Sequence, residues 1–215
     1  DLGMEAYSFH APFAEHIDIS SLNEQIRIDS RDEMLKAAEA AAMMNVRQFV
    51  IHPGPERGGF PKEEYLRRAD HVIETLNEIA ETCKSYKISL SLENMLPHLF
   101  TGYIKDILWI IGALESTKVS TCLDTGHAFL SNDLPTAPEK LKGTLAMIHL
   151  NDNKRNYDDH YPPGDGYIVW KDFFQALHAN QFDGTLILEL TGDCPREEVL
   201  NNAKRGRKYV RELTK

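Results

Sequence analysis

Short apolar runs alternate along this chain with longer stretches in which apolar residues recur every three or four positions. The short runs are apolar on successive residues and rich in β-branched side chains, which is typical of parallel strands buried on both faces. The longer stretches are typical of amphipathic helices. We therefore predict strands at residues 6–10, 47–52, 88–93, 118–123, 145–150 and 185–190.

Helices are predicted between and after these strands. Pro61 opens the clearest one, because proline is favourable in a first helical turn and an apolar stripe follows it. Ser30 followed by Glu33 resembles a capping box, which indicates a helix that begins near Ser30. The expected helices cover residues 30–44, 61–86, 170–179 and 196–213.

This alternation implies parallel strands joined by right-handed crossovers, and therefore an α/β fold. An open doubly wound sheet and a closed barrel both satisfy it. No glycine-rich phosphate loop follows an early strand, which disfavours a dinucleotide-binding sheet. The 215 residues suit one domain, and we find no linker or low-complexity segment, so we expect a single domain over residues 1–215.

Composition and charge narrow the class of protein. No apolar run approaches the ~20 residues that span a bilayer, and no signal segment opens the chain, so we expect no membrane partner. Cys83, Cys122 and Cys194 are odd in number and far apart, which argues against a disulfide framework and predicts a cytoplasmic protein. The net charge of −9 disfavours nucleic acid as a partner.

Each predicted strand has a side chain that can bind a metal ion within one residue of its carboxyl end. Taken singly, such a residue is most often a cap or a solvated group. Six of them at the same end of six strands are not expected by chance, and burying them unpaired would be costly. Because the carboxyl ends of parallel strands share one face, we expect a common site. Its residues are His10, His52, Glu93, Asp124, His149 and Glu189.

Carboxylates dominate the second half of this set. An oxygen-rich, four-ligand site of this kind suits Mn²⁺, Co²⁺, Mg²⁺ or Zn²⁺. Its ligands would be Glu93, Asp124, His149 and Glu189. Further donors would favour zinc, or more than one metal ion. These are His10, His52, His127, Asp158 and His160. We expect one ion per chain, and the wider set has donors for up to three.

The sequence CLDTGHAF, residues 122–129, places His127 three positions after Asp124. If the strand ends at Asp124 and Gly126 forms a tight turn, His127 folds back over the site. The alternative is a histidine at the start of a helix that faces solvent.

A second polar segment, YDDHYPPGDG at residues 157–166, is a loop by composition. Its rigid Pro162 and Pro163 would hold Asp158 and His160 over the pocket. The alternative is an acidic surface loop whose prolines only limit its entropy. We favour the functional interpretation, because long polar loops at a barrel mouth commonly carry function.

The chain resembles the xylose isomerase-like TIM-barrel superfamily in seven motifs, which in order are SFHAPF, VIHPG, SLEN, CLDTGHAF, IHLNDN, DDHYPPGDG and LILEL. This superfamily includes sugar phosphate isomerases and epimerases, ketose 3-epimerases and endonuclease IV-type AP endonucleases. The resemblance spans nearly the whole chain and implies a TIM (β/α)8-type barrel. The first ligand-bearing strand of the family is usually the third of eight, so we expect a chain that is N-terminally short by two βα units. Six strands cannot close such a barrel, and an open edge at residues 4–10 would favour a homo-oligomer.

The resemblance implies two alternative sites. In the sugar isomerase and epimerase branch, four residues hold one Mn²⁺-type ion, and in the ketose 3-epimerases the two glutamates among them also move the proton on the sugar carbon. The matching residues are Glu93, Asp124, His149 and Glu189. Residues that match His127 and Arg155 contact the substrate in that branch. The endonuclease IV branch uses a three-zinc site, whose ligands match His10, His52, Glu93, Asp124, His127, His149, Asp158, His160 and Glu189.

Other features favour the sugar branch. The loop DDHYPPGDGYIVW resembles that of the sugar isomerase- and epimerase-like proteins, and the acidic charge suits a small polar substrate better than a DNA backbone. The chain also lacks aromatic and basic loops that would open a duplex. We therefore expect a metal-dependent isomerase or epimerase of a sugar or sugar phosphate. The alternatives are a zinc phosphodiesterase that acts on abasic DNA, and a barrel that binds metal without turnover.

Overall fold

Strands and helices follow one another in regular alternation in the computed structural model, which describes residues 3–116 and 118–214. The contacts among these residues divide the chain into two compact units. Unit 1 holds residues 3–93, 98–101 and 105–120, and unit 2 holds residues 94–97, 102–104 and 121–214. Each unit has its own set of parallel strands.

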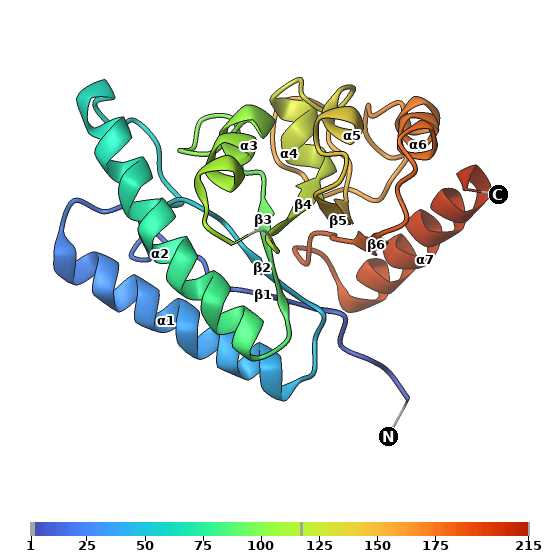
Figure 1. Cartoon of the computed structure of the whole chain (residues 1–215). Coiled ribbons are helices and arrows are strands. Elements are labelled where there is room, and N and C mark those ends of the chain that lie inside the picture. The colour runs from blue at the N-terminus through green and yellow to red at the C-terminus, as the bar shows by residue number, and fades with distance from the viewer. Residues whose placement is uncertain (1–2, 117, 215) are drawn as a thin grey trace. The chain divides into compact units, whose positions relative to one another are not determined.

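Unit 1 is built from parallel strands covered by two long helices. β1 pairs with β2 and β2 with β3, and Phe49 lies opposite Leu90 in this register. Helices α1 and α2 lie side by side against these strands (Figure 1). The elements are β1 (Ser8–His10), α1 (Glu24–Met43), β2 (Gln48–Ile51), η1 (Lys62–Glu64), α2 (Tyr65–Ser85), β3 (Ser89–Glu93) and, from its second residue, α3 (Ile104–Ala113).

The apolar stripe of α2 forms much of the core of unit 1. Val72, Leu76, Ile79 and Cys83 recur at spacings of three and four and are all 0% exposed. They belong to one hydrophobic cluster with Phe49 and Ile51 of β2 and with Leu90 and Leu92 of β3. Burial also raises the pKa of the Cys83 thiol to about 12, so this cysteine is an inert core side chain.

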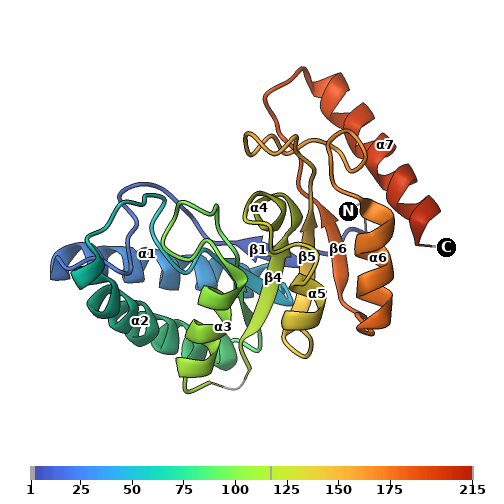
Figure 2. The same ribbon diagram turned by 90° about the horizontal axis from the view of Figure 1, so that it is seen from above.

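Unit 2 contains the second set of parallel strands, in the order β4, β5, β6. Asp124, the last residue of β4, lies opposite His149 of β5. Helix α7 lies beside β6, and α6 lies beside α7 (Figure 2). The elements are β4 (Ser120–Asp124, whose first residue belongs to unit 1), α4 (Thr125–Leu130), α5 (Ala137–Lys140), β5 (Leu145–Leu150), α6 (Trp170–Ala179), β6 (Thr185–Leu188) and α7 (Arg196–Leu213).

The secondary structure predicted from the sequence is largely confirmed. All six strands occur where the apolar runs placed them, and α6 and α7 match the predicted helices at residues 170–179 and 196–213. The helix predicted from Pro61 is formed by η1 and α2. No described helix is both long and apolar enough to cross a membrane.

The predicted start of the first helix is wrong. Helix α1 begins at Glu24, and the side chain of Asn23 caps it by accepting hydrogen bonds from the amides of Gln25 and Ile26. Ser30 lies inside the helix, where its Oγ donates to the carbonyl of Ile26 at 2.7 Å and accepts from the amide of Asp18 at 2.8 Å. Ser30 and Glu33 therefore have the spacing of a capping box without its geometry.

The N-cap provides a test of where α1 begins. Asn23→Ala removes the acceptor of two amides and should lower the free energy of unfolding by about 1 kcal/mol in urea denaturation. Glu33→Ala is the matched control, because its side chain is 43% exposed. We expect the control to change stability by less than about 0.5 kcal/mol. A larger loss from Glu33→Ala than from Asn23→Ala would contradict this helix start.

Candidate metal centre

In unit 1 the parallel register brings three metal-binding side chains to the carboxyl ends of adjacent strands. His10 ends β1, His52 follows β2 and Glu93 ends β3. The Nε2 atom of His10 lies 3.0 Å from Glu93 Oε2, and Nε2 of His52 lies 3.7 Å from the same oxygen. One donor atom from each of the three residues lies within 4.8 Å of the others. We name His10, His52 and Glu93 the unit 1 cluster.

The far side of each imidazole fixes the direction of the ring. The Nδ1 atom of His10 lies 2.7 Å from the carbonyl oxygen of Ala11, which can only accept, so Nδ1 donates. His52 Nδ1 lies 2.6 Å from Glu56 Oε1. Both rings therefore present Nε2 to Glu93. A histidine held on a carbonyl or carboxylate in this way has the orientation that metal-binding histidines adopt in proteins.

In unit 2 a similar cluster forms at the ends of β4, β5 and β6. Its members are Asp124, His149 and Glu189, and their donor atoms also lie within 4.8 Å of one another. The Nδ1 atom of His149 lies 3.0 Å from Glu189 Oε2. We name these residues the strand-end cluster.

Asp124 has a structural role in addition to its place in the strand-end cluster. Its Oδ1 accepts a hydrogen bond from the amide of His127 at 2.7 Å and so caps the N-terminus of α4, and Oδ2 accepts from Asn151 Nδ2 at 2.5 Å. The side chain of Asn94 binds both the amide and the carbonyl of Asp124. These contacts hold the carboxylate in a fixed orientation.

A third group lies in unit 2 between α4 and the loop that follows β5. Asp158 Oδ2 lies 3.1 Å from Nε2 of His127 and 3.0 Å from Nε2 of His160. The Nδ1 atoms of both rings donate to backbone carbonyls, at 2.8 Å to Asn94 and 3.2 Å to Glu189. The other oxygen, Asp158 Oδ1, is buried and has no hydrogen-bond partner in the part of the chain that the structure describes. We name His127, Asp158 and His160 the loop cluster.

The charges in unit 2 fix the protonation states of the loop cluster. Burial by itself would lower the pKa of His160, but the hydrogen bond that its ring donates to Asp158 and the charges of Asp124, Asp158 and Glu189 raise it to about 9. Burial by itself would raise the pKa of Asp158, but the hydrogen bonds from His127 and His160 hold it well below its usual value. At neutral pH Asp158 is therefore ionised and His160 carries a proton, which a metal ion would have to displace.

The donor sets of all three clusters fit a divalent ion. Each combines imidazole nitrogen with carboxylate oxygen, and the rings of the unit 1 and loop clusters have Nδ1 fixed by a partner. Mixed nitrogen and oxygen donors suit Zn²⁺, Co²⁺ and Mn²⁺. A cation would take the place of the proton that imidazole and carboxylate now share.

The expected tight turn at Gly126 is wrong, and so is the alternative of a solvent-facing His127. Strand β4 leads directly into α4, Gly126 is the second residue of that helix, and His127 is only 7% exposed. Glycine is required here for space, because a Cβ at this position would lie 2.0 Å from Asn151 Oδ1. The close approach of Asn151 in turn allows its hydrogen bond to Asp124.

Arg155 lies on the loop after β5, and its guanidinium contacts α4. Nη1 donates to Asn132 Oδ1 at 2.7 Å, and the guanidinium lies 4.3 Å from the centre of the Phe129 ring. These contacts hold an exposed cation beside the helix that carries His127.

Sequence reasoning missed three polar residues that hold the ligands in place, namely Glu56, Asn94 and Asn151. Asn94 and Asn151 directly follow a strand that carries a candidate ligand, and that position is the signal that could have identified them. Glu56 lies in a loop rich in proline and glycine, where no periodic pattern distinguishes it.

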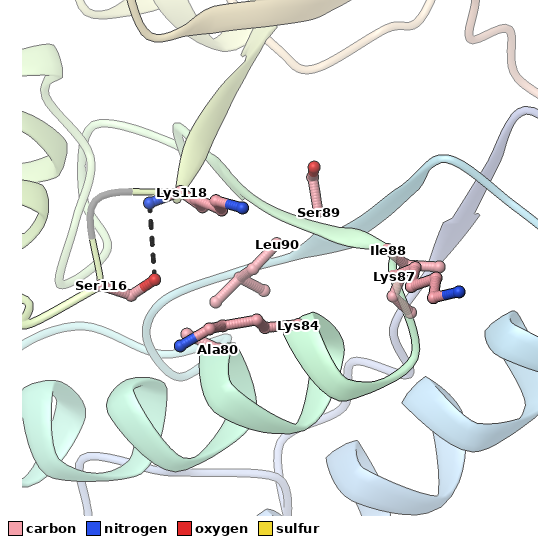
Figure 3. Close-up of a pocket in the computed structure, with 8 residues that line it drawn as sticks. All are labelled: Ala80, Lys84, Lys87, Ile88, Ser89, Leu90, Ser116 and Lys118. Atoms are coloured by element: carbon pink, nitrogen blue, oxygen red, sulfur yellow. Dashed lines mark hydrogen bonds between the residues drawn. The ribbon is translucent and has the colours of Figure 1, made fainter.

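A hollow of about 260 Å³ in unit 1 has different chemistry. It lies at the start of β3, whereas Glu93 lies at the end of that strand, and lysines line it (Figure 3). No histidine or carboxylate is among its lining residues, which are Ala80, Lys84, Lys87, Ile88, Ser89, Leu90, Ser116 and Lys118. This hollow is therefore not a cation site.

The sequence profile of the xylose isomerase-like TIM barrel matches residues 1–213. The chain belongs to the xylose isomerase-like TIM-barrel family. This membership confirms both the resemblance and the barrel-type fold class expected from the sequence. Among solved structures, a D-tagatose 3-epimerase-like protein is similar with a TM-score of 0.85 and 25% identity, over 99% of this chain and 78% of that one. The zinc-bound IolI protein, at 16% identity and a TM-score of 0.77, covers 98% of this chain and 76% of its own and shares the fold.

The sequence relatives of this xylose isomerase-like chain include uncharacterized proteins and probable endonucleases. An uncharacterized protein of Methanocaldococcus jannaschii is 30% identical over 84% of this chain and 62% of its own length. The probable endonuclease 4 of Acholeplasma laidlawii is 26% identical over 80% of this chain and 63% of its own length. The chain thus spans less than two thirds of the length of these relatives.

The glycine in α4 gives a test of the packing around Asp124. Gly126→Ala should force Asn151 away from Asp124 and lower the free energy of unfolding by about 1–3 kcal/mol, measured in urea. Gly112→Ala is the matched control, because Gly112 also lies in a helix and a Cβ there would meet nothing within 4 Å. That control should be neutral or stabilising by up to about 1 kcal/mol. Equal effects of the two substitutions would contradict the close approach of Asn151.

Proposed function

We propose that this chain is a divalent-metal-dependent isomerase or epimerase of a sugar or sugar phosphate, which acts by proton transfer next to a carbonyl. The observation that carries the proposal is the strand-end cluster, where one imidazole and two carboxylates meet at the ends of three adjacent parallel strands. The similarity to a D-tagatose 3-epimerase-like protein at 25% identity supports a sugar substrate.

One ion would be held by Asp124, His149 and Glu189 of unit 2 together with Glu93 of unit 1. The place of Glu93 in this set rests on the order of the motifs and on the resemblance to the family. A bound divalent ion would polarise the carbonyl and the neighbouring hydroxyl of a sugar, which makes the hydrogen on the carbon between them more acidic.

The residues of the chain itself would then move the proton. One of the two glutamates, Glu93 or Glu189, takes the proton from the carbon, and the other returns a proton to it. His127 and Arg155 would orient the substrate. The net charge of −9 supports a small polar substrate over a nucleic acid. A cytoplasmic location and a homo-oligomer remain predictions.

Exchange of carbon-bound hydrogen in D₂O tests the proposal. With Mn²⁺ or Co²⁺ present, a panel of ketoses and their phosphates should include at least one that exchanges. Glu189→Gln should slow this exchange by about 10²- to 10⁴-fold, because an amide cannot accept the proton. Glu197→Gln is the matched control, since Glu197 is exposed in the first turn of α7. The absence of exchange on every sugar, with metal shown to be bound, would contradict the proposal.

A second candidate function is hydrolysis of abasic DNA by a zinc cluster. The observation that favours it is the loop cluster, which together with the unit 1 cluster supplies donors beyond those that one ion needs. The similarity to a probable endonuclease 4 at 26% identity points the same way.

Metal content separates the two candidates. We expect one tightly bound ion per chain after dialysis, measured by elemental analysis, and no nicking of a duplex that carries one abasic site. A matched duplex without the abasic site is the control. Three zinc ions per chain, together with cleavage at the abasic site that Asp158→Asn abolishes, would favour the nuclease and overturn the isomerase.

A further inference from the structure

Asp152 is a fully buried carboxylate that lies two residues after β5. It is 0% exposed, and four N–H groups bind it. Oδ1 accepts from the amides of Asn153 at 2.9 Å and Ile168 at 3.1 Å. Oδ2 accepts from the amide of Gly164 at 3.0 Å and from the indole of Trp170 at 2.8 Å. An ionised carboxylate with this many donors is satisfied without a metal or a positive side chain.

The four donors come from both ends of one loop. Asn153 begins the segment, Gly164 and Ile168 lie near its end, and Trp170 is the first residue of α6, which follows it. The backbone of Asp152 also pairs with Tyr161, at 2.8 Å and 2.9 Å. The segment 153–168 therefore closes around the carboxylate. This segment carries Asp158 and His160, the two members of the loop cluster that do not lie in α4.

The position of the Asp152 carboxylate also explains the glycines of this loop. A Cβ on Gly166 would lie 2.2 Å from Asp152 Oδ1, so only glycine lets the chain pass there. Gly164 has a φ of +96°, a conformation that other residues rarely adopt. The PPGDG sequence is thus shaped by the need to surround Asp152.

The loop also holds two residues in an unfavourable backbone conformation. Arg155 has a φ of 67° and His160 a φ of 48°, in the left-handed region that costs energy for residues with a Cβ. Such conformations persist only where the surrounding contacts determine them. Tyr161, the residue after His160, pairs with the backbone of Asp152, and His160 directs its Nε2 at Asp158.

We propose that Asp152 is a positioning residue, which holds Asp158 and His160 against His127 so that the loop cluster is preformed. The inference rests on the proposed function for the role of that cluster, as ligands or as substrate contacts. Asp152 itself would contact neither the metal ion nor the substrate. It acts through the loop, because loss of its acceptor oxygens would free both ends of the segment.

The test is a double-mutant cycle in the full chain with Asp152→Asn and Asp158→Asn. An asparagine at position 152 turns an N–H₂ group toward N–H donors and so breaks half of the contacts. We expect Asp152→Asn to raise the Kd for Co²⁺ or the KM for the sugar by 10- to 100-fold. Asp158→Asn should raise the same parameter, whether that is the Kd for Co²⁺ or the KM for the sugar. The double variant should be within about twofold of Asp158→Asn alone, because the first residue acts through the second.

Hydrogen exchange and a control variant accompany the cycle. Amides of 153–168 should lose protection in Asp152→Asn while those of β4 and β5 keep theirs. Asp172→Asn is the control for charge, since Asp172 is exposed in the first turn of α6. If Asp152→Asn does not fold, Trp170→Phe removes a single donor and Gly166→Ala displaces the carboxylate by its Cβ, and both should show the same pattern.

Two results would overturn the inference. One is an Asp152→Asn protein whose Co²⁺ affinity and KM stay within about twofold of wild type, and the other is a double variant in which the two losses multiply. Failure of the proposed function is distinguishable, because a wild-type chain that binds Co²⁺ without exchanging any sugar still reports the effect of Asp152 on the Kd. A wild-type chain that binds neither Co²⁺ nor sugar would overturn both proposals.

Discussion

Buried negative charge is the constraint on which the rest of this structure depends. Carboxylates at the ends of parallel strands leave water when the strands pack, and each then needs a compensating partner. The chain meets this need in two ways. Asp152 is surrounded by N–H donors, which satisfy its carboxylate without a metal ion. Asp158 and Glu189, whose side chains are 23% and 34% exposed, instead face imidazole nitrogens, and an imidazole can release its proton to make room for a metal ion.

This difference separates carboxylates that build the site from those that act in it. Asp124 combines both roles, since it caps α4 and binds Asn151 while it shares the strand-end cluster with His149. The cap fixes the start of α4, and the start of α4 fixes His127 against the carbonyl of Asn94. The residues from Asp124 to His127 thus determine where β4 ends, where α4 begins and which way the His127 ring points.

The sequence predicts well those features whose physical signal lies within a few residues. It predicts poorly those that depend on residues far apart in the chain. The strands were found because runs such as LAMIHL are apolar at every position except the candidate ligand His149, a pattern typical of strands buried on both faces. The candidate ligands were found because each one ends such a run. The start of α1 was missed because Asn23 lies in a polar stretch, while Ser30 and Glu33 imitate a capping box three residues apart. Asp152 was missed because an aspartate in a polar segment looks solvated until three of its four donors, 12 to 18 residues away, are placed around it.

The most direct test of the account is a crystal structure of the metal-loaded chain, with anomalous scattering recorded at the edge of the added metal. The account predicts an ion bonded to a ring nitrogen of His149 and to carboxylate oxygens of Asp124, Glu189 and Glu93, at about 2.0–2.2 Å. An ion held by other residues, or no ion at these donors at saturating metal, would contradict it.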